Sequence, residues 1–503
     1  MLLGVAQSNG SDASSTEFAP HEGQVAPPAS TAAGKVSPHW PQRYTASVIF
    51  GLGCCSLIFL KANPDDRIRL RQRSPLIASA AEVLGPVLED FLGPHLPVRF
   101  VFWDGSEIPG RGESEAQVIF RTPLALRRLI YAPNELGLGR AYVAGDLDLD
   151  GDIFEILALR DRLAAQRDHT TLDLGRKRWA QLLRAGRTLG AFGPPTPPPS
   201  EEARLKGRLH SRSRDAAAIG HHYDISNDFY RLVLGETMTY SCAYYPSADT
   251  TLDQAQRAKY DLICRKLGLH AGMRLLDVGC GWGGMVMHAA EHYGVEAVGV
   301  TISPAQAELA EKRVAEAGLA DLVEIRLQDY RALAGERFNA ISSIGMFEHV
   351  GLSQLTRYLR VLYALLEPRG RLLNHAISRP PGPSGFDKRS FITRYVFPDG
   401  ELHEVGSVVS AMQSEGFEVR DVESLREHYG RTLRGWMSNL EADWTDAVSH
   451  AGAARSRIWR LYLAGSALGF EGGRLNIHQV LAVKTTSDGG SGMPPTRRSF
   501  TSE

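Results

Sequence analysis

The chain has 503 residues with 43% hydrophobic and 22% charged side chains, a composition that excludes a disordered or coiled-coil protein. Its 56 Lys and Arg residues nearly balance 57 Asp and Glu residues, and the net charge of -1 argues against nucleic-acid binding by the chain as a whole. Its five cysteines are scattered and lack metal-ligand spacing. We therefore expect no metal site and no disulfide framework, and the expected compartment is the reducing cytoplasm.

Residues 1–73 are predicted to be a disordered leader, because Ser, Ala, Gly and Pro dominate them as far as Pro41. The leader includes one apolar segment of fifteen residues, Ala46–Leu60. An α-helix needs roughly 20 apolar residues to span a bilayer, and the segment lies too far from Met1 for an ordinary signal peptide. We interpret it as part of a non-essential extension, with a weak membrane anchor as the alternative.

Residues 74–190 are predicted to form a small α+β domain. Two segments rich in β-branched and aromatic residues, Val98–Gly105 and Ala116–Thr122, indicate strands. Apolar residues spaced three and four apart indicate helices over Leu124–Ile130 and Ile153–Leu163. The segment contains no cluster of acids, bases or nucleophiles, so we expect an accessory role in docking on lipid.

Residues 191–213 are predicted to be a linker, since Gly193–Ser200 reads GPPTPPPS and such a proline-rich stretch is stiff. The window Arg176–Arg214 around it holds ten Lys and Arg residues against two Glu, a net charge of +8. A solvated face is one reading of this charge. The other is attraction to an anionic membrane surface, at about 1 kcal/mol per basic residue, and it is favoured by the apolar residues among the charges: Trp179, Leu182, Leu183 and Leu205.

Residues 214–485 alternate predicted strands and helices, the pattern of a doubly wound, mostly parallel α/β sheet with helices on both faces. Helices are expected to begin near Gly284, Pro304, Ser353 and Gly406. Residues 486–503 are polar and glycine-rich and are predicted to be a flexible tail. The expected strands are Arg274–Val278, Ala297–Ile302, Val323–Leu327, Asn339–Ile344 and Leu372–Ile377.

A glycine-rich turn follows the first of these strands, in the segment Met273–Gly284. Its glycines also fit the dinucleotide pattern G-x-G-x-x-G, but the next strand ends in Gly299–Ser303 without the acid that a dinucleotide ribose requires. Asp277 stands directly before the turn, where it suits a cationic ligand without a pyrophosphate. The pattern therefore favours S-adenosylmethionine over NAD and indicates a fold of the class I methyltransferase type.

Seven ordered blocks resemble the cyclopropane-fatty-acyl-phospholipid synthases and the related mycolic-acid cyclopropane synthases. The likeness extends from about residue 214 to the C-terminus. The blocks are HHYDISNDFY (His221–Tyr230), MTYSCAYYP (Met238–Pro246), LLDVGCGWGG (Leu275–Gly284), GVTISPAQ (Gly299–Gln306), LQDYR (Leu327–Arg331), GMFEHVG (Gly345–Gly351) and RYVFPDGEL (Arg394–Leu402).

The resemblance implies a set of residues that hold S-adenosylmethionine. Thr301, Ile302 and Gln306 would take the place of the usual acid at the ribose, although core packing is an equal alternative for Ile302 and Ile344. The implied set is Tyr240, Ser241, Asp277, Gly279, Gly281, Gly283, Thr301, Ile302, Gln306, Gln328, Asp329 and Ile344.

The resemblance also implies a bound bicarbonate that acts as the base, held by a small polar cluster. Glu348 and His375 would follow or end strands at the carboxyl edge, where open α/β sheets bind ligands. Each member has another reading: Cys242 as a small buried hydrophobe, Glu348 as a solvated loop residue, and His349 as a rival to Glu348. The implied catalytic set is Cys242, Glu348, His375, Ile377 through its backbone, and Tyr429.

The implied activity is methylene transfer from S-adenosylmethionine to the double bond of unsaturated acyl chains in membrane phospholipids, which forms a cyclopropane ring. The protein would lie peripherally on the inner face of the membrane, and the resemblance leads us to expect a homodimer. A synthase of methylene- or methyl-branched chains is the alternative enzyme, and a non-catalytic lipid-binding protein is the alternative of another class. Asn374, Asp399 and His403 depart from the family pattern, which puts details of the acyl slot in doubt.

Overall fold

The computed structural model describes the chain from the start of its first ordered helix almost to its C-terminus. The leader, residues 1–73, and residues 204–213 of the linker lie outside the described residues, so the predictions made for them stay predictions. Residues 74–503 form one compact unit. The described residues are 78–93, 96–111, 115–165, 176–203, 214, 225–333, 335–382 and 390–501.

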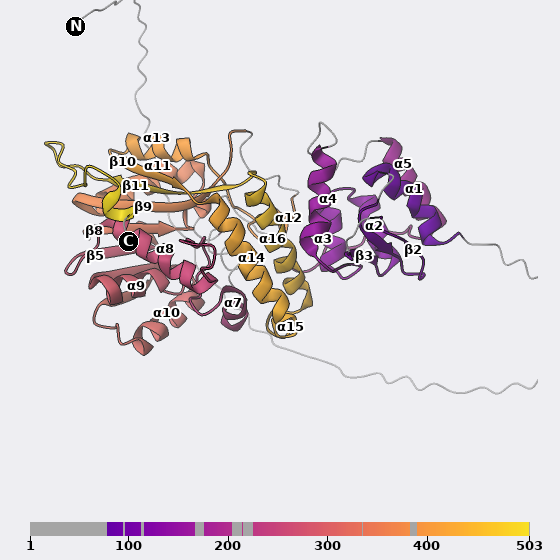
Figure 1. Ribbon diagram of the computed structural model, residues 1–503, viewed down its shortest axis with the longest axis horizontal. Helices are drawn as coiled ribbons and strands as arrows, with labels where there is room; N and C mark the ends of the chain where they lie inside the picture. The colour runs from indigo at the N-terminus through magenta and orange to yellow at the C-terminus, as the bar shows by residue number, and fades with distance from the viewer. Residues whose placement is uncertain are drawn as a thin grey trace, which may run out of the picture. The chain divides into compact units, whose positions relative to one another are not determined.

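The larger sheet has seven strands in the order β10-β11-β9-β8-β5-β6-β7 (Figure 1). Its five strands from β9 to β7 are parallel, whereas β11 runs antiparallel to both β9 and β10. This confirms the predicted mostly parallel sheet. The bounds are β5 Arg274–Val278, β6 Glu296–Thr301, β7 Val323–Leu327, β8 Phe338–Ile344, β9 Leu366–Ser378, β10 Glu418–Ser424 and β11 Asn476–Val483.

Helices cover both faces of this sheet, as the strand–helix alternation predicted. Residues of α8 (Leu252–Leu267) and α9 (Gly284–Tyr293) share one buried cluster with the sheet, and residues of α11 (Leu352–Leu365) and α13 (Val405–Ser414) share another. α10 (Pro304–Glu316) joins the first cluster through Val314. The sequence sets the ends of α8, which begins at a capping box of Thr251 and Gln254 and ends at the left-handed Gly268.

The sequence analysis did not predict a group of helices that lie before and after the outer strand β10 along the chain. α7 (Asn227–Leu234) comes before the sheet, α12 (Phe391–Tyr395) follows β9, and three helices between β10 and β11 complete the group. The three are α14 Arg426–Ala442, α15 Trp444–Ala451 and α16 Ala453–Glu471, with α14 beside α16 (Figure 1). Their buried side chains include five aromatic ones, namely Tyr429, Trp436, Trp459, Tyr462 and Phe470.

The N-terminal α+β domain has its own four-stranded sheet in the order β2-β1-β3-β4. Both predicted strands and both predicted helices are present. The strands are β1 Arg99–Val101, β2 Glu107–Ile108, β3 Gln117–Phe120 and β4 Leu147–Asp150, and the helices are α1 Ala80–Leu92, α2 Pro123–Tyr131, α3 Glu135–Val143, α4 Ile153–Ala165 and α5 Arg176–Thr188. None of the helices in the described part of the chain is long and apolar enough to cross a membrane.

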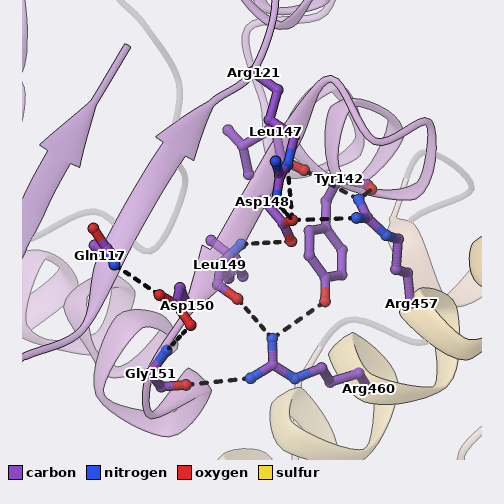
Figure 2. A network of polar contacts seen from close by, with 10 residues as sticks. All are labelled: Gln117, Arg121, Tyr142, Leu147, Asp148, Leu149, Asp150, Gly151, Arg457 and Arg460. Atoms are coloured by element: carbon purple, nitrogen blue, oxygen red, sulfur yellow. Dashed lines mark hydrogen bonds and ion pairs between the residues drawn. The ribbon is translucent and has the colours of Figure 1, made fainter. Parts of the chain in front are cut away.

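Two arginines of α16 bind the open edge of the N-terminal sheet (Figure 2). Arg460 donates to the Leu149 carbonyl at 2.8 Å and to the Gly151 carbonyl at 3.2 Å, while Arg457 donates to the Tyr142 carbonyl at 2.9 Å. β4 is an edge strand, and an edge strand leaves backbone groups without a neighbouring strand. The Arg460 guanidinium therefore binds backbone carbonyls of β4 and the residue after it, and with Arg457 it links α16 to the N-terminal domain.

The described residues of the linker and the tail make specific contacts with the rest of the chain. Arg128 donates to the Pro197 carbonyl at 2.8 Å, and the buried Glu202 forms a bidentate ion pair with Arg140, so the described part of the linker is packed rather than free. At the other end of the chain, Phe500 in α17 (Arg498–Thr501) is buried with residues of α8. The prediction of a flexible tail is therefore wrong at its end, because the polar composition concealed a single anchoring aromatic residue.

Candidate active site

A cavity opens at the carboxyl ends of the parallel strands, on either side of the glycine-rich turn after β5. About 930 Å³ in and above it is free of protein atoms, a volume that includes space open to solvent. The position is where open α/β sheets bind ligands, beside the point at which the strand order reverses. Ten of the twelve predicted cofactor residues line it: Tyr240, Ser241, Asp277, Gly279, Gly281, Thr301, Ile302, Gln306, Gln328 and Ile344.

The glycines of the turn have the backbone conformation that their residue type permits. Gly279 has φ +80°, and the N–H groups of Gly279 and Cys280 both donate to the Val300 carbonyl, at 2.9 and 3.0 Å. A Cβ atom at Gly279 would also lie 3.3 Å from the sulfur of Met346. The turn thus brings backbone rather than side chains to the cavity wall.

Two predicted cofactor residues do not line the cavity. Gly283, also left-handed, is the N-cap of α9 and faces Ala310 of α10, so it supports the turn from behind. The Asp329 carboxylate binds the Arg331 guanidinium at 2.6 Å and accepts from the Arg331 N–H at 2.9 Å. The sequence placed both residues in the right turn and loop but could not show which way each faces.

Asp277 supplies a carboxylate to the cavity wall. One of its oxygens accepts from the Ser342 hydroxyl at 2.6 Å. Burial raises the pKa of Asp277 to about 6, against the opposing effects of this hydrogen bond and of the Lys259 charge. A carboxylate with so little solvent around it would bind a cationic group in the cavity strongly.

Lys259 on α8 also lines the cavity, and the sequence analysis missed it. Its ammonium group donates to the Ser241 hydroxyl at 3.0 Å and lies 3.9 Å from the centre of the Tyr260 ring. The side chain is fully buried, and burial lowers the pKa of Lys259 to about 7. The available signal was that Lys259 falls among the apolar positions of its helix, where lysine is rare.

We expect Lys259→Met to remove a characteristic pH dependence of stability. Between pH 7 and the ordinary lysine pKa of 10.5, the unfolded chain binds the proton that the folded chain has lost, so wild-type stability rises with pH. The gain of the wild type over the variant should approach about 1.4 kcal/mol per pH unit in that range. Urea unfolding at pH 7, 8 and 9 measures it, with the exposed Lys312→Met as the control. Equal slopes for wild type and Lys259→Met would contradict a titrating buried lysine.

Glu348 and Ile377 are in direct contact beyond the cavity. The Ile377 N–H donates to Glu348 Oε1 at 2.7 Å, whereas Glu348 Oε2 is buried and has no hydrogen-bond partner among the described residues. Burial raises the pKa of Glu348 to about 7. The alternative of a solvated loop carboxylate is therefore wrong.

His375 lies in the same strand as Ile377, two residues earlier and so on the same face of β9. Its Nδ1 is 3.1 Å from Nε2 of Gln479, and its own Nε2 is buried without a partner in the described part of the chain. Burial holds the pKa of His375 well below its usual range, and the charges of Lys259 and Lys266 act in the same direction. The imidazole is therefore neutral, with one unused nitrogen.

Cys242 and Tyr429 are both buried near the start of α14. The Cys242 thiol donates to the Ala243 carbonyl at 3.2 Å, and burial raises its pKa, so it is a neutral thiol. The Tyr429 ring packs 4.6 Å from that of Phe470. None of the five predicted catalytic residues lines the cofactor cavity, but the Lys259 charge acts on both Cys242 and His375, which places them close behind its wall.

Aromatic rings gather around Tyr240 at the edge of the cavity. The Tyr240 hydroxyl donates to that of Tyr462 at 2.9 Å, and the Tyr240 ring centre lies 5.3 Å from Trp436 and 5.4 Å from Trp459. Trp436, Trp459 and Tyr462 come from α14 and α16, which the sequence analysis did not predict. The faces of such rings are electron-rich and attract cations.

Two family models match the chain. The model described as mycolic acid cyclopropane synthetase matches residues 210–480, which include the whole cavity and the polar cluster. A second model, described only as a domain of unknown function, matches residues 92–167 of the N-terminal domain.

Individual relatives agree with this match. The chain is 43% identical to a probable fatty acid methyltransferase of Mycobacterium tuberculosis, over 82% of this chain and 97% of that protein. It is 33% identical to the cyclopropane-fatty-acyl-phospholipid synthase of Escherichia coli, over 75% and 90%. Among solved structures, a cyclopropane synthase of Mycobacterium tuberculosis matches with a TM-score of 0.51 and 33% identity, covering 55% of this chain and 99% of that one. A mycolic acid cyclopropane synthase in complex with SAH and CTAB matches with a TM-score of 0.50 and 35% identity, over 53% and 97%.

Proposed function

We propose that this chain, which belongs to the cyclopropane synthase family, transfers a methylene group from S-adenosylmethionine to double bonds in the acyl chains of membrane phospholipids. One observation carries the proposal. Glu348 Oε2 and His375 Nε2 are buried polar atoms without partners among the described residues, in a chain whose cavity fits a cationic cofactor. Such atoms are costly to bury unless a ligand satisfies them.

S-Adenosylmethionine supplies an electrophilic methyl group on a positively charged sulfur. The residues of the cavity suit it: Asp277 offers a carboxylate to its positive charges, and the turn at Gly279 offers backbone rather than bulk. Thr301 and Gln306, joined by a 2.9 Å hydrogen bond, stand where a dinucleotide enzyme carries an acid. This supports the choice of S-adenosylmethionine over NAD.

Methyl transfer to an isolated alkene leaves positive charge on the acyl chain. The ring cluster of Tyr240, Trp436 and Trp459 supports a role in stabilising that charge, because it presents aromatic faces beside the cavity and excludes water. The Tyr240–Tyr462 hydrogen bond holds the first ring in place.

Bicarbonate fits the polar cluster as the base. Glu348 Oε2 can accept its hydroxyl hydrogen, and a protonated His375 Nε2 can donate to its oxygen, so the two unpartnered atoms offer the two complementary roles. Cys242, the Ile377 backbone and Tyr429 would complete the site, as the family resemblance implies. Bound there, bicarbonate would supply a proton acceptor that the methyl donor does not readily alkylate.

A second candidate product is a methyl- or methylene-branched chain. The observation that favours it is 32% identity to the tuberculostearic acid methyltransferase of Mycobacterium tuberculosis, over 82% of this chain. Both routes begin from the same cation. Loss of a proton from the delivered methyl group with ring closure gives the cyclopropane, whereas a 1,2-hydride shift followed by loss of a methyl proton gives the exocyclic methylene, and a saturated methyl branch needs a further two-electron reduction by an external reductant. A bound base at Glu348 and His375 suits the direct loss of the methyl proton and supports the cyclopropane product without excluding the other.

The product distinguishes the two candidates. Purified protein is incubated with S-adenosylmethionine carrying a ¹³C-labelled methyl group and with vesicles of unsaturated phospholipid, and the extracted lipid is examined by proton and carbon NMR. High-field ring protons on the labelled carbon are expected. Labelled exocyclic alkene or methyl signals would establish the branched product, and unlabelled lipid would contradict both activities.

The first part of the basic window Arg176–Arg214, which includes α5, supports docking on the inner face of the membrane. α5 packs Leu182, Ala185 and Gly186 inward. Beside it, three large aromatic side chains stay exposed, namely Tyr131 by 52%, Trp179 by 42% and Phe192 by 50%. They are neighbours, because the Trp179 indole donates to the carbonyl of Ile130 and the Tyr131 hydroxyl to that of Gly193. The exposed basic residues of α5 are Arg176, Lys177, Arg184 and Arg187.

We expect Trp179→Ser combined with Arg184→Glu and Arg187→Glu to weaken binding to vesicles of anionic phospholipid at least tenfold, since each basic residue near such a surface contributes about 1 kcal/mol. Vesicle sedimentation at two salt concentrations measures it. The control combines Leu352→Ser and Lys312→Glu, which alter exposed side chains elsewhere on the chain. Equal losses in the two variants would contradict docking through α5.

A further inference from the structure

Gln479 is a buried glutamine that faces the predicted catalytic histidine. In the antiparallel pairing of β9 with β11, Gln479 stands directly opposite His375. Both side chains are fully buried, and Gln479 Nε2 lies 3.1 Å from His375 Nδ1. The sequence analysis gave Gln479 no role, because β11 was not predicted.

The contact determines which nitrogen of His375 carries the proton. A neutral imidazole has one N–H donor and one acceptor nitrogen. In the orientation found here, the amide nitrogen of Gln479 faces Nδ1 and can only donate, so Nδ1 accepts, while Gln479 Oε1 is buried without a partner among the described residues. The single proton of the neutral ring is then on Nε2, the atom that has no partner among the described residues.

We propose that Gln479 is a positioning residue that holds His375 in the Nε2–H tautomer and so presents a hydrogen-bond donor to the anion bound in the polar cluster. The proposal rests on the bicarbonate site described under Proposed function. In the other tautomer, Nε2 would direct a lone pair at the anion and repel it. Gln479 would therefore act on the anion only through His375.

The charges around His375 favour this arrangement. Lys259 and Lys266 of α8 carry positive charges that oppose protonation of the His375 imidazole. Glu348 approaches from the loop after β8 and accepts from the Ile377 N–H on the same strand. With the ring neutral, the choice between its two nitrogens falls to the hydrogen bond from Gln479.

The tautomer can be read directly. Protein labelled with ¹⁵N at histidine is examined by long-range ¹H–¹⁵N correlation NMR, and the His375→Asn spectrum assigns the signal. We expect an Nε2–H tautomer with an unprotonated Nδ1 in the wild type, and a mixture of tautomers in Gln479→Leu. A wild-type His375 protonated on Nδ1 would overturn the proposal whether or not the protein is active.

A charge substitution provides a second readout. In Gln479→Glu the carboxylate raises the pKa of the His375–Glu pair. Below that pKa both ring nitrogens carry a proton, so Nε2 still has its hydrogen. Above it the ring keeps a single proton, which moves to Nδ1 because Nδ1 faces the carboxylate. We therefore expect the KM for bicarbonate to stay near the wild-type value at pH 6 and to rise at least tenfold by pH 9. An unchanged pH profile would overturn the proposal.

The control is His478→Gln, one residue earlier in β11. His478 Nδ1 pairs with the Ser378 hydroxyl at 2.8 Å, so this variant changes a polar contact between the same two strands without touching His375. It should leave the tautomer and the KM for bicarbonate unchanged. Activity that does not depend on bicarbonate in the wild type would refute the base assigned under Proposed function, and the NMR result would still decide the role of Gln479.

Discussion

Glu348→Gln is expected to lower kcat/KM for the unsaturated phospholipid by about 10² to 10³-fold, the usual contribution of a group that works in proton transfer. The substitution keeps the shape of the side chain and its contact with the Ile377 N–H. It removes the charge from the buried oxygen that has no partner in the described residues. The base would then be held in a weaker and less defined orientation.

The pH dependence of kcat/KM should also change in Glu348→Gln. Burial raises the pKa of Glu348 to about 7, so the carboxylate forms only as the pH rises through that value. Only the ionised group is free to accept from bicarbonate without competing as a donor. Wild-type kcat/KM is therefore expected to rise between pH 6 and pH 8 at constant bicarbonate concentration, and this limb should be absent in Glu348→Gln.

Glu401→Gln is a matched control, because Glu401 also accepts from a backbone N–H, that of Leu352 at 2.8 Å, but does so at the surface. It should leave both rate and profile unchanged. Equal rates for Glu348→Gln and wild type would refute the role of this carboxylate, and a limb that persists in the variant would assign the titration to another group.

Asp277→Asn is expected to weaken binding of S-adenosylmethionine about 10- to 100-fold, because a hydrogen bond or contact to a charged group contributes about 1.5–3 kcal/mol. S-Adenosylhomocysteine lacks the charge on sulfur, and its affinity should fall less. The asparagine retains a group that can accept from the Ser342 hydroxyl, so the local structure should persist. Isothermal titration with both ligands measures the difference.

The same carboxylate predicts an acid limit for binding. Its pKa of about 6 means that protonation below that pH neutralises the group, so wild-type affinity for S-adenosylmethionine should fall as the pH drops from 7 to 5. Asp277→Asn should show no such fall. Asp329→Asn is the control, since Asp329 pairs with Arg331 and does not line the cavity. A similar loss in both variants would contradict the assignment of Asp277.

Local sequence patterns were sufficient for the parallel strands. β5 and β7 have the predicted bounds. β5 is a short apolar segment buried between β6 and β8. β7 is the edge strand of the sheet, and its sequence VEIRL alternates apolar and charged residues. β10 and β11 were missed. They follow helical segments. The antiparallel pairing of β11 with β9, and of β10 with β11, depends on a return of the chain that no local pattern encodes.

The residues of the candidate site likewise divide into those that the sequence predicted and those that it missed. Glycine needs the positive φ of Gly279, and a carboxylate before the turn is visible in the sequence, so most of the cofactor residues could be predicted. Lys259 was missed although it falls among the apolar positions of its helix, and Gln479 could not be predicted, because its significance comes from burial in a strand that was itself missed. A lysine or glutamine in a sequence looks solvated until the helix or strand that carries it is packed.

The sequence by itself therefore determined the class of fold, the positions of the parallel strands along the chain and the chemistry of the turn, since these depend on backbone preferences and on residues close together in the chain. Only the tertiary structure decided which polar atoms lose water. It placed Glu348 Oε2 and His375 Nε2 without partners in the described part of the chain and set Gln479 against the histidine. It also brought the rings of α14 and α16 to Tyr240. Desolvation is a property of the packed chain as a whole, and it shifts the pKa values on which the proposed chemistry depends.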